Sequence, residues 1–274
     1  MAAMLDLDAE VLHTYLSEVT SWVADLADGM TVRRILDLGS GTGKGTFALL
    51  PHFKDAEAIA VDSSPHMLRH LRDKARERGV TDRVRTVEAD LDAAWPDFGE
   101  VDLVWASASL HHMADPDRAL RDMFAALRPG GLLAVIELEG VPRFLPDDLG
   151  VGRPGLEARC QAAMAHQRAE TMPHMGADWG PRLADAGFVI EGERPFTVEL
   201  TSPFPEPARR YAQMVLRRTR TGLDGRLSAD DLSVLDALID DDGPQSVLRR
   251  NDLTMRAERM VWMGRRPEGR GAGE

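Results

Sequence analysis

Short apolar runs alternate with amphipathic stretches along the first half of the chain. The runs at residues 34–38, 56–61, 83–89 and 101–106 are rich in aliphatic and β-branched residues, which is typical of strands buried on both faces of a parallel sheet. Between the second and third runs, residues 65–78 place apolar residues at helical spacing. This alternation predicts an α/β fold in which helices wind doubly around a mostly parallel sheet.

The second half of the chain extends the sheet and adds helices to it. Three further strands are expected at residues 127–137, 188–200 and 253–264, which makes seven strands in all. An N-terminal helix near residues 8–27 is expected to cover the site, and helical patterns between the later strands are expected to form a cap. The predicted organisation is an N-terminal helix at 1–30, a core at 31–139, a cap insertion at 140–175, the rest of the core at 176–264 with a helical insertion at 203–250, and a flexible tail at 265–274.

The first strand leads directly into a glycine-rich loop. Residues 35–45 read ILDLGSGTGKG and place four glycines in seven positions. Glycine tolerates positive φ and carries no Cβ, so the backbone of such a loop can touch a small molecule. The dinucleotide fingerprint G-x-G-x-x-G fails here because its last glycine falls on Lys44 or Thr46. The pattern of the phosphate-binding P-loop does not match either, because Leu38 stands where it requires Gly and Gly45 stands where it requires Ser or Thr.

The segment DLGSGTG, from Asp37 to Gly43, resembles the first motif of the class I methyltransferases that use S-adenosylmethionine. Further features follow in the order of that family. Asp62 ends the second strand about 20 residues beyond the glycines, where doubly wound folds place an acid that binds ribose hydroxyls. The others are Asp90 with Leu91 after the third strand, SASLHHM at 107–113 after the fourth, and LRPGGLLAVIE at 127–137.

The resemblance implies that residues 31–139 bind S-adenosylmethionine as the cofactor. It places Asp62 on the ribose, Asp90 on the adenine amino group with Leu91 over the ring, and the segment at 107–113 beside the sulfonium. The residues that it implies as cofactor contacts are Asp37, Gly39, Ser40, Gly41, Thr42, Gly43, Asp62, Ser63, Met67, Asp90, Leu91, Ala106, Ser107 and His111.

Composition narrows the class of substrate. The net charge of −12 repels a polyanion, so a nucleic-acid substrate is not expected. Cys160 is the one cysteine, which allows neither an internal disulfide nor a thiolate zinc cluster. No run approaches the roughly 18 apolar residues of a membrane span, and the start MAAMLDLDAE lacks the features of an export signal. We therefore expect a cytoplasmic monomer or homodimer with a small-molecule substrate and with no nucleic acid, membrane or metal partner.

The chemistry that the resemblance implies needs few protein groups. A methyl group on a sulfonium is already activated, so alignment of donor and acceptor in a dry pocket can carry most of the transfer. A general base within hydrogen-bond reach of the acceptor adds about 10² to 10⁴ in rate. The candidate catalytic residues are His111, His112 and Glu137, at the ends of the fourth and fifth strands. Alternatively, the two histidines only shape the loop and pack against the cofactor.

Residues outside the core are candidates for the acceptor site. Tyr15 in the N-terminal helix could close over the cofactor, and His166, His174 and Trp179 in or beside the cap could contact the acceptor. These last three could equally form the core of the cap. We interpret the chain as an S-adenosylmethionine-dependent methyltransferase that acts on oxygen or nitrogen of a small organic acceptor. Two alternatives remain open, namely a rearrangement or cyclisation on the same fold and a protein that senses the cofactor.

Overall fold

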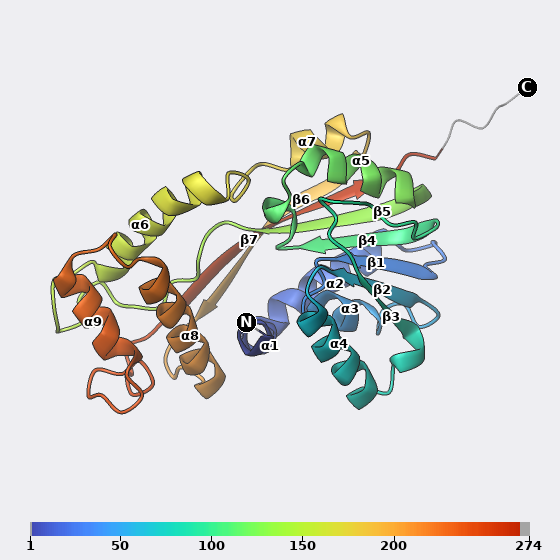
Figure 1. Cartoon of the computed structure of the whole chain (residues 1–274). Coiled ribbons are helices and arrows are strands. Elements are labelled where there is room, and N and C mark those ends of the chain that lie inside the picture. The colour runs from blue at the N-terminus through green and yellow to red at the C-terminus, as the bar shows by residue number, and fades with distance from the viewer. Residues whose placement is uncertain (1, 269–274) are drawn as a thin grey trace, which may run out of the picture.

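The computed structural model describes residues 2–268, and these residues form one seven-stranded sheet (Figure 1). The strands are β1 (Arg34–Leu38), β2 (Glu57–Asp62), β3 (Val84–Glu88), β4 (Val101–Ser107), β5 (Leu127–Leu138), β6 (Val189–Leu200) and β7 (Met255–Arg265). Their order is β3-β2-β1-β4-β5-β7-β6, in which β1 to β5 run parallel and β7 runs antiparallel to both β5 and β6. The predicted mostly parallel, seven-stranded α/β fold is confirmed.

Helices cover both faces of the sheet (Figure 1). Within the described residues they are α1 (Ala2–Val11), α2 (His13–Leu26), α3 (Lys44–Leu49), α4 (Pro65–Glu77), α5 (Pro116–Ala126), α6 (Leu156–Thr171), α7 (Gly180–Asp185), α8 (Glu206–Gly222) and α9 (Ala229–Ile239). Consecutive residues of β1 face opposite layers, because Ile35 packs in the cluster of Val23 from α2 and Leu36 packs in the cluster of Leu120 from α5. This burial on both sides explains the continuous apolar runs.

The N-terminal segment forms two helices where the sequence predicts one. The break falls at Leu12, which has φ −97° and ψ 19° and is buried in the core. The change of direction lets α2 pack on the sheet while α1 turns away toward α3 and α8 (Figure 1). The predicted helix at 8–27 is therefore wrong as a single element, although the segment is helical and covers the site edge of the sheet.

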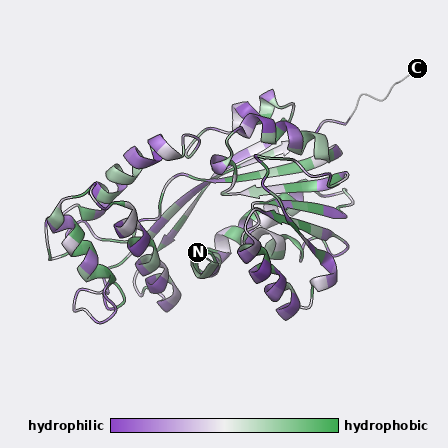
Figure 2. Ribbon diagram, in the orientation of Figure 1, coloured by the Kyte–Doolittle hydropathy of each residue, from purple (hydrophilic) through white to green (hydrophobic). Residues whose placement is uncertain are grey.

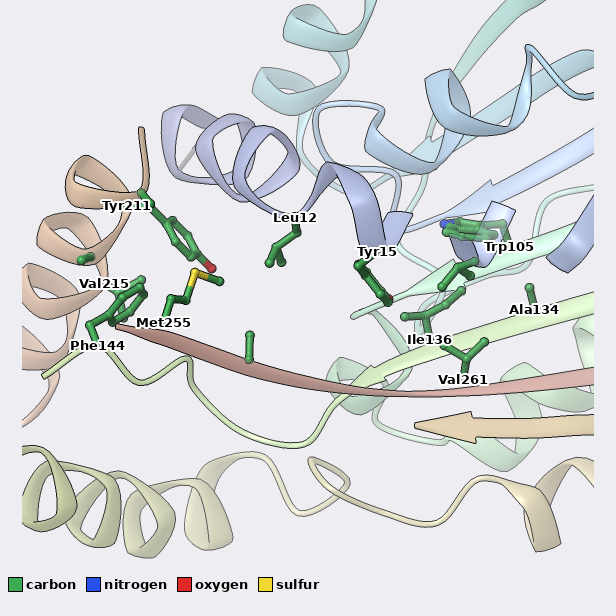
Figure 3. Packing of buried hydrophobic residues seen from close by; sticks show 14 of the residues in the cluster. Leu12, Tyr15, Trp105, Ala134, Ile136, Phe144, Tyr211, Val215, Met255 and Val261 are labelled. Carbon is green, nitrogen blue, oxygen red and sulfur yellow. The ribbon is translucent and has the colours of Figure 1, made fainter. Parts of the chain in front are cut away.

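The last two strands connect the sheet to the helical cap. β6 and β7 continue past the other strands as a two-stranded ribbon, and α6, α8 and α9 gather around its far end (Figure 1). One buried cluster runs along this ribbon, from Ile136 beside the sheet through Met255 to Tyr211 and Val215 in the cap (Figure 3). The cap and the sheet therefore share a continuous apolar core.

Polar residues concentrate on the helices. Figure 2 shows the central strands β4 and β5 as largely hydrophobic and α4 as mostly hydrophilic, in keeping with its amphipathic sequence. Only Leu68, Leu71 and Ala75 of α4 are buried. The helical patterns of the sequence thus correspond to helices that bury one face.

The last strand, β7, includes Arg265, where the sequence predicts that a flexible tail starts. Arg265 still belongs to β7 and pairs with Leu132 of β5, and the Arg266 guanidinium donates to the Phe124 carbonyl at 3.0 Å. These two residues are therefore attached to the sheet and to α5. Residues 269–274, the rest of the predicted tail, lie outside the described residues.

Neither a membrane span nor a cluster of metal ligands is found between residues 2 and 268. No helix in that range has the length and apolar content that crossing a bilayer requires. The same range brings together no group of three His, Cys, Asp or Glu side chains that could hold a metal ion.

Candidate functional site

The loop between β1 and α3 lies at the carboxyl ends of the parallel strands, where ligands of open α/β sheets bind. Gly39 and Gly41 take φ values of 66° and 53°, which favour glycine. A Cβ on Gly39 would lie 2.6 Å from Ser109 Cβ, and one on Gly41 would lie 3.3 Å from Leu5 Cδ1 of α1. The chain itself therefore bounds this loop on two sides, with the segment after β4 and with the N-terminal helix.

Asp37 joins the loop to α3. Its side chain is buried, and its Oδ2 accepts hydrogen bonds from Thr46 N at 2.8 Å and from Thr46 Oγ1 at 2.6 Å. Burial raises the pKa of Asp37 to about 6, against the lowering effect of these two hydrogen bonds. Asp37 thus supports the loop through Thr46, and the direct cofactor contact predicted for it stays a prediction.

Asp62 ends β2 and faces the glycine loop. Its Oδ2 accepts a hydrogen bond from Gly41 N at 2.9 Å, and its Oδ1 accepts one from Ser64 N at 2.8 Å. Each carboxylate oxygen keeps a second lone pair, so the group can still accept two hydroxyls. Ser63 beside it is exposed, and Met67 N donates to Ser64 Oγ at the start of α4.

The segment after β3 is held in place from α5. Arg118 Nη2 donates to the carbonyls of Leu91 at 2.6 Å and Asp92 at 2.9 Å. Leu91 is buried, whereas Asp90 is exposed and its Oδ1 accepts a hydrogen bond from Asp92 N. This segment therefore combines a fixed apolar side chain with an accessible carboxylate, as the sequence predicts for an adenine site.

Two buried hydroxyls at the glycine loop lack a hydrogen-bond partner. Ser40 and Ser109 are each 6% exposed, and neither Oγ atom finds a partner among residues 2–268. A buried polar atom without a partner costs about 1–3 kcal/mol, so the pair indicates a polar ligand at this loop. Sequence reasoning missed Ser109, although it lies within SASLHHM, which begins at Ser107 directly after Ala106 at the end of β4.

His111 and Glu137 form a buried pair at the ends of β4 and β5. His111 Nδ1 lies 2.5 Å from Glu137 Oε2, and the two side chains are 2% and 3% exposed. Glu137 Oε1 also accepts from Leu110 N at 2.9 Å, which fixes the turn after β4. His112 is exposed, and partial burial together with the charges of His111 and Arg218 lowers its pKa. The structure therefore brings two of the three predicted catalytic residues together and leaves His112 beside them.

Tyr15 lies close to this pair. It is buried in α2, with its ring centroid 5.6 Å from that of Phe196 in an edge-on arrangement. Burial raises the pKa of the Tyr15 hydroxyl, and the charges of Asp8 and Glu137 raise it further. The position is compatible with the predicted contact to an acceptor, which stays a prediction.

Two of the residues predicted to contact the acceptor differ in burial, and both contacts stay predictions. Trp179 is fully buried and packs in one cluster with Leu183 and Phe188. The His166 side chain is 76% exposed and lies 3.5 Å from Glu170 Oε1 on the outer surface of α6. His174 lies partly buried in the turn after α6, and its role stays a prediction.

A polar cluster that the sequence does not predict joins four elements near Tyr15. Asp8 of α1 contacts Lys44 Nζ of α3 at 2.6 Å and Tyr211 Oη of α8 at 2.7 Å. Arg259 Nη2 of β7 lies 3.7 Å from the same carboxylate. Asp8 and Tyr211 are 203 positions apart, so no local pattern could have indicated their contact.

The central part of the chain matches a known family. Residues 35–131 fit the model of a family described as a methyltransferase domain. The matched range contains the glycine loop, Asp62, the segment after β3 and both unpartnered hydroxyls. Residues 35–131 therefore match a methyltransferase domain, in agreement with the resemblance of Asp37–Gly43 to the class I S-adenosylmethionine-dependent methyltransferases.

Two relatives support this methyltransferase assignment. The chain is 38% identical over 120 residues to demethylmenaquinone methyltransferase of Thermus thermophilus, a match that covers 43% of this chain and 53% of that protein. It is 31% identical over 135 residues to the ubiquinone/menaquinone biosynthesis C-methyltransferase UbiE of Idiomarina loihiensis, with coverage of 49% and 53%. The chain thus spans about half the length of these relatives.

The solved structure of the [4+2]-cyclase SpnF has a similar fold. The two structures share a TM-score of 0.52 at 21% sequence identity, and the match covers 92% of this chain and 82% of that chain. At this identity the likeness concerns the fold alone. It extends beyond the methyltransferase domain into the second half of the chain.

S-adenosylmethionine is the cofactor of this family, and the site suits it. Asp62 retains a free lone pair on each oxygen, and Leu91 offers an apolar surface next to the Asp90 carboxylate. The buried hydroxyls of Ser40 and Ser109 need the partners that the polar end of such a ligand would supply. The residues around the glycine loop therefore fit the cofactor.

Proposed function

We propose that the protein transfers the methyl group of S-adenosylmethionine to a small organic acceptor. The observation that supports this most is the closeness of two features at one edge of the sheet. The unpartnered Ser109 hydroxyl lies in the segment after β4 that borders the glycine loop, and the buried His111–Glu137 pair begins two residues further along the chain. A donor site beside a proton-accepting group is what methyl transfer to a protonated acceptor atom requires.

In this proposal the chain holds the cofactor by three kinds of contact. Asp62 accepts hydrogen bonds from the ribose hydroxyls. Asp90 accepts a hydrogen bond from the adenine amino group, and Leu91 covers the ring. Ser40 and Ser109 bind the amino-acid end, which relieves the two unpartnered hydroxyls. When bound, the cofactor supplies a methyl group on a positively charged sulfur, which is activated for displacement in line with an acceptor.

Glu137 prepares His111 for its role. A carboxylate bound to Nδ1 favours the proton on that nitrogen, which leaves the lone pair of Nε2 for the proton of the acceptor. Glu137 then stabilises the imidazolium that forms. Both side chains are buried, which keeps bulk water from this proton transfer and strengthens their interaction. With the cofactor bound, its sulfonium would supply the methyl group and keep the electron pair of the broken bond, and His111 would take up the proton that the acceptor loses.

The proposed acceptor atom is oxygen or nitrogen. An O–H or N–H group gives up its proton to an imidazole as it is methylated. Carbon is the alternative, since one relative is named a C-methyltransferase and an activated C–H group also needs a base. A small acceptor is proposed over a nucleic acid because the net charge of −12 repels a polyanion. We also propose that the protein acts in the cytoplasm.

Calorimetry with S-adenosylmethionine and S-adenosylhomocysteine tests the first half of this proposal. We expect both to bind the wild-type protein and to bind the Ser109→Ala variant more weakly. No detectable binding of either molecule to the folded protein would contradict the cofactor site.

Product analysis tests the second half. The protein is incubated with methyl-labelled S-adenosylmethionine and a panel of phenols, amines and activated carbon acids. Mass spectrometry should detect the gain of one methyl group, and nuclear magnetic resonance should identify the methylated atom. A product of unchanged mass would indicate a rearrangement or cyclisation. Tight cofactor binding with no turnover would indicate a sensor, and either result would refute methyl transfer.

A further inference from the structure

The cluster around Asp8 places two cations and a phenol on a single carboxylate. Lys44 Nζ and Tyr211 Oη lie within hydrogen-bond distance of Asp8, and Arg259 Nη2 lies 3.7 Å away. The side chains of Asp8, Lys44 and Arg259 are only 15%, 21% and 7% exposed. Two hydrogen bonds and one longer charge contact thus converge on the Asp8 carboxylate, which is a set of groups suited to binding a carboxylate.

The electrostatics favour an anion at this point. Burial alone would raise the pKa of Asp8, but Lys44 and Arg259 outweigh it, and the pKa lies below its ordinary value. Without Asp8, the two cations would keep their enclosed positions with less compensating charge. Partly buried cations are costly without an anionic partner, so another anion would be drawn to the site.

Asp8 lies on α1, which has fewer fully buried residues than α3, α8 and β7, the elements that carry its partners. Ala2 is the one fully buried residue described for α1. Met4, Leu7 and Val11 are only partly buried against the core. Polar contacts also hold the helix, and they include Asp6 with Thr42 Oγ1 at 2.8 Å and an ion pair of Asp6 with Lys74.

The three donors sit on firmly packed elements. Tyr211 is buried and its ring lies edge-on to that of Phe144, with centroids 5.7 Å apart. Arg259 pairs with Leu138 in the sheet, and Lys44 begins α3 directly after the cofactor loop. The donors would therefore stay in place if α1 moved.

The cluster also adjoins the proposed reaction site. Tyr15 lies close enough for the charges of Asp8, Arg259 and Glu137 all to shift its pKa. Figure 3 shows Tyr15 and Tyr211 on either side of Leu12, along the inner side of the segment that joins α1 to α2. The Asp8 carboxylate thus connects the start of α3, directly after the cofactor loop, with α8 of the cap.

We propose that Lys44, Tyr211 and Arg259 bind an anionic group of the acceptor, in the simplest case a carboxylate, and that Asp8 occupies this position until the acceptor displaces it. The inference rests on the proposed function, because it assigns the substrate class of that site. The overall charge of −12 attracts no anion by itself, so selection of an acidic acceptor depends on these local donors.

Benzoate and its neutral counterpart benzamide are suitable probes. We expect calorimetry on the full-length protein with bound S-adenosylhomocysteine to show that Asp8→Asn binds benzoate about tenfold or more tightly than wild type, because the internal competitor is weakened. Benzamide should show no such gain. Glu10→Gln is the matched control, since it removes the same charge from an exposed position of the same helix, and it should bind benzoate as wild type does.

Hydrogen exchange on the wild-type protein tests the displacement itself. Benzoate should speed exchange of the α1 amides, whereas benzamide should not. Arg259→Met in the Asp8→Asn background should remove the gain in affinity, and Tyr211→Phe should weaken benzoate binding if the double variant does not fold. Equal affinity of wild type and Asp8→Asn, an equal gain with benzamide, or α1 exchange unchanged by benzoate would each overturn the inference.

These readouts do not depend on turnover, so the two proposals can fail separately. Methylation of neutral acceptors with no preference for the matching acids would refute the acidic substrate class and leave methyl transfer intact. Benzoate that displaces α1 in a protein that binds no S-adenosylhomocysteine would refute the proposed function and leave an anion site.

Discussion

Replacing Asp62 with asparagine separates the two roles proposed for its carboxylate. In the structure each oxygen accepts one backbone N–H, from Gly41 at 2.9 Å and from Ser64 at 2.8 Å. Asparagine keeps one acceptor oxygen and presents an NH₂ group to the second N–H. We therefore expect the variant to lose one backbone hydrogen bond in the free protein and one proposed ribose hydrogen bond in the complex.

The magnitudes follow from the charge of the acceptor. A hydrogen bond to a charged group contributes about 1.5–3 kcal/mol, so S-adenosylhomocysteine should bind Asp62→Asn about 10- to 150-fold more weakly. The unpaired N–H of the loop should lower the free energy of unfolding by about 1–3 kcal/mol. Calorimetric titration measures the first quantity and chemical denaturation the second.

A matched variant controls for the loss of charge. Asp73 lies on α4 with its side chain 55% exposed and paired with Arg76, so Asp73→Asn removes the same charge away from the loop. It should leave both measurements near the wild-type values. If Asp62→Asn bound S-adenosylhomocysteine as wild type does, or if Asp73→Asn lost as much affinity, the ribose assignment would be refuted.

Three further variants test other parts of the site and the cap. Ser109→Ala removes an unpartnered buried hydroxyl, so calorimetry should show about 2- to 10-fold weaker S-adenosylhomocysteine binding, while the ligand-free protein loses no stability. A variant that lost stability but bound S-adenosylhomocysteine as wild type does would refute the ligand contact. Glu137→Gln leaves His111 without its carboxylate, so kcat should fall about 10- to 100-fold at unchanged S-adenosylhomocysteine affinity, and an unchanged kcat would exclude the pair as base. Burial raises the pKa of Glu157 from its ordinary 4.5 to about 7, so chemical denaturation of the wild type should show a free energy of unfolding that decreases as pH rises through that interval. Glu157→Gln should lack this decrease, and equal pH dependence of the two proteins would contradict the raised pKa.

The sheet and the cofactor loop could be predicted because their signals are local. A strand buried on both faces is apolar at every position, and β1 shows this directly before the glycine loop. Asp62, Leu91 and His111 each follow a strand, so the fold alone carries them to the same edge. Ser109 belongs to the same class, and only a count of buried hydrogen bonds distinguishes it from its neighbours.

The acceptor side could not be predicted because its contacts are distant in sequence. Asp8 meets Tyr211 and Arg259 through the packing of α1 against the cap, which no pattern in α1 records. Trp179 is an aromatic residue of the kind that often lines a pocket, yet its place directly before α7 leads its side chain to pack in the core with Leu183. Helical spacing shows that a helix has an apolar face, and the tertiary fold decides what that face meets.

The uninterrupted ribbon of β6 and β7 has a consequence for how a substrate enters. Because paired strands and one apolar core pass from the sheet into the cap, the cap cannot swing open as a separate body without breaking that core. On the proposal above, admission of an acceptor then depends on the first helix, which has one fully buried residue and is held to the cap through Asp8. Exchanging the cap for that of another enzyme would alter the stability of the whole molecule, whereas loosening the Asp8 contacts of the first helix would mainly alter the rate at which the site is reached.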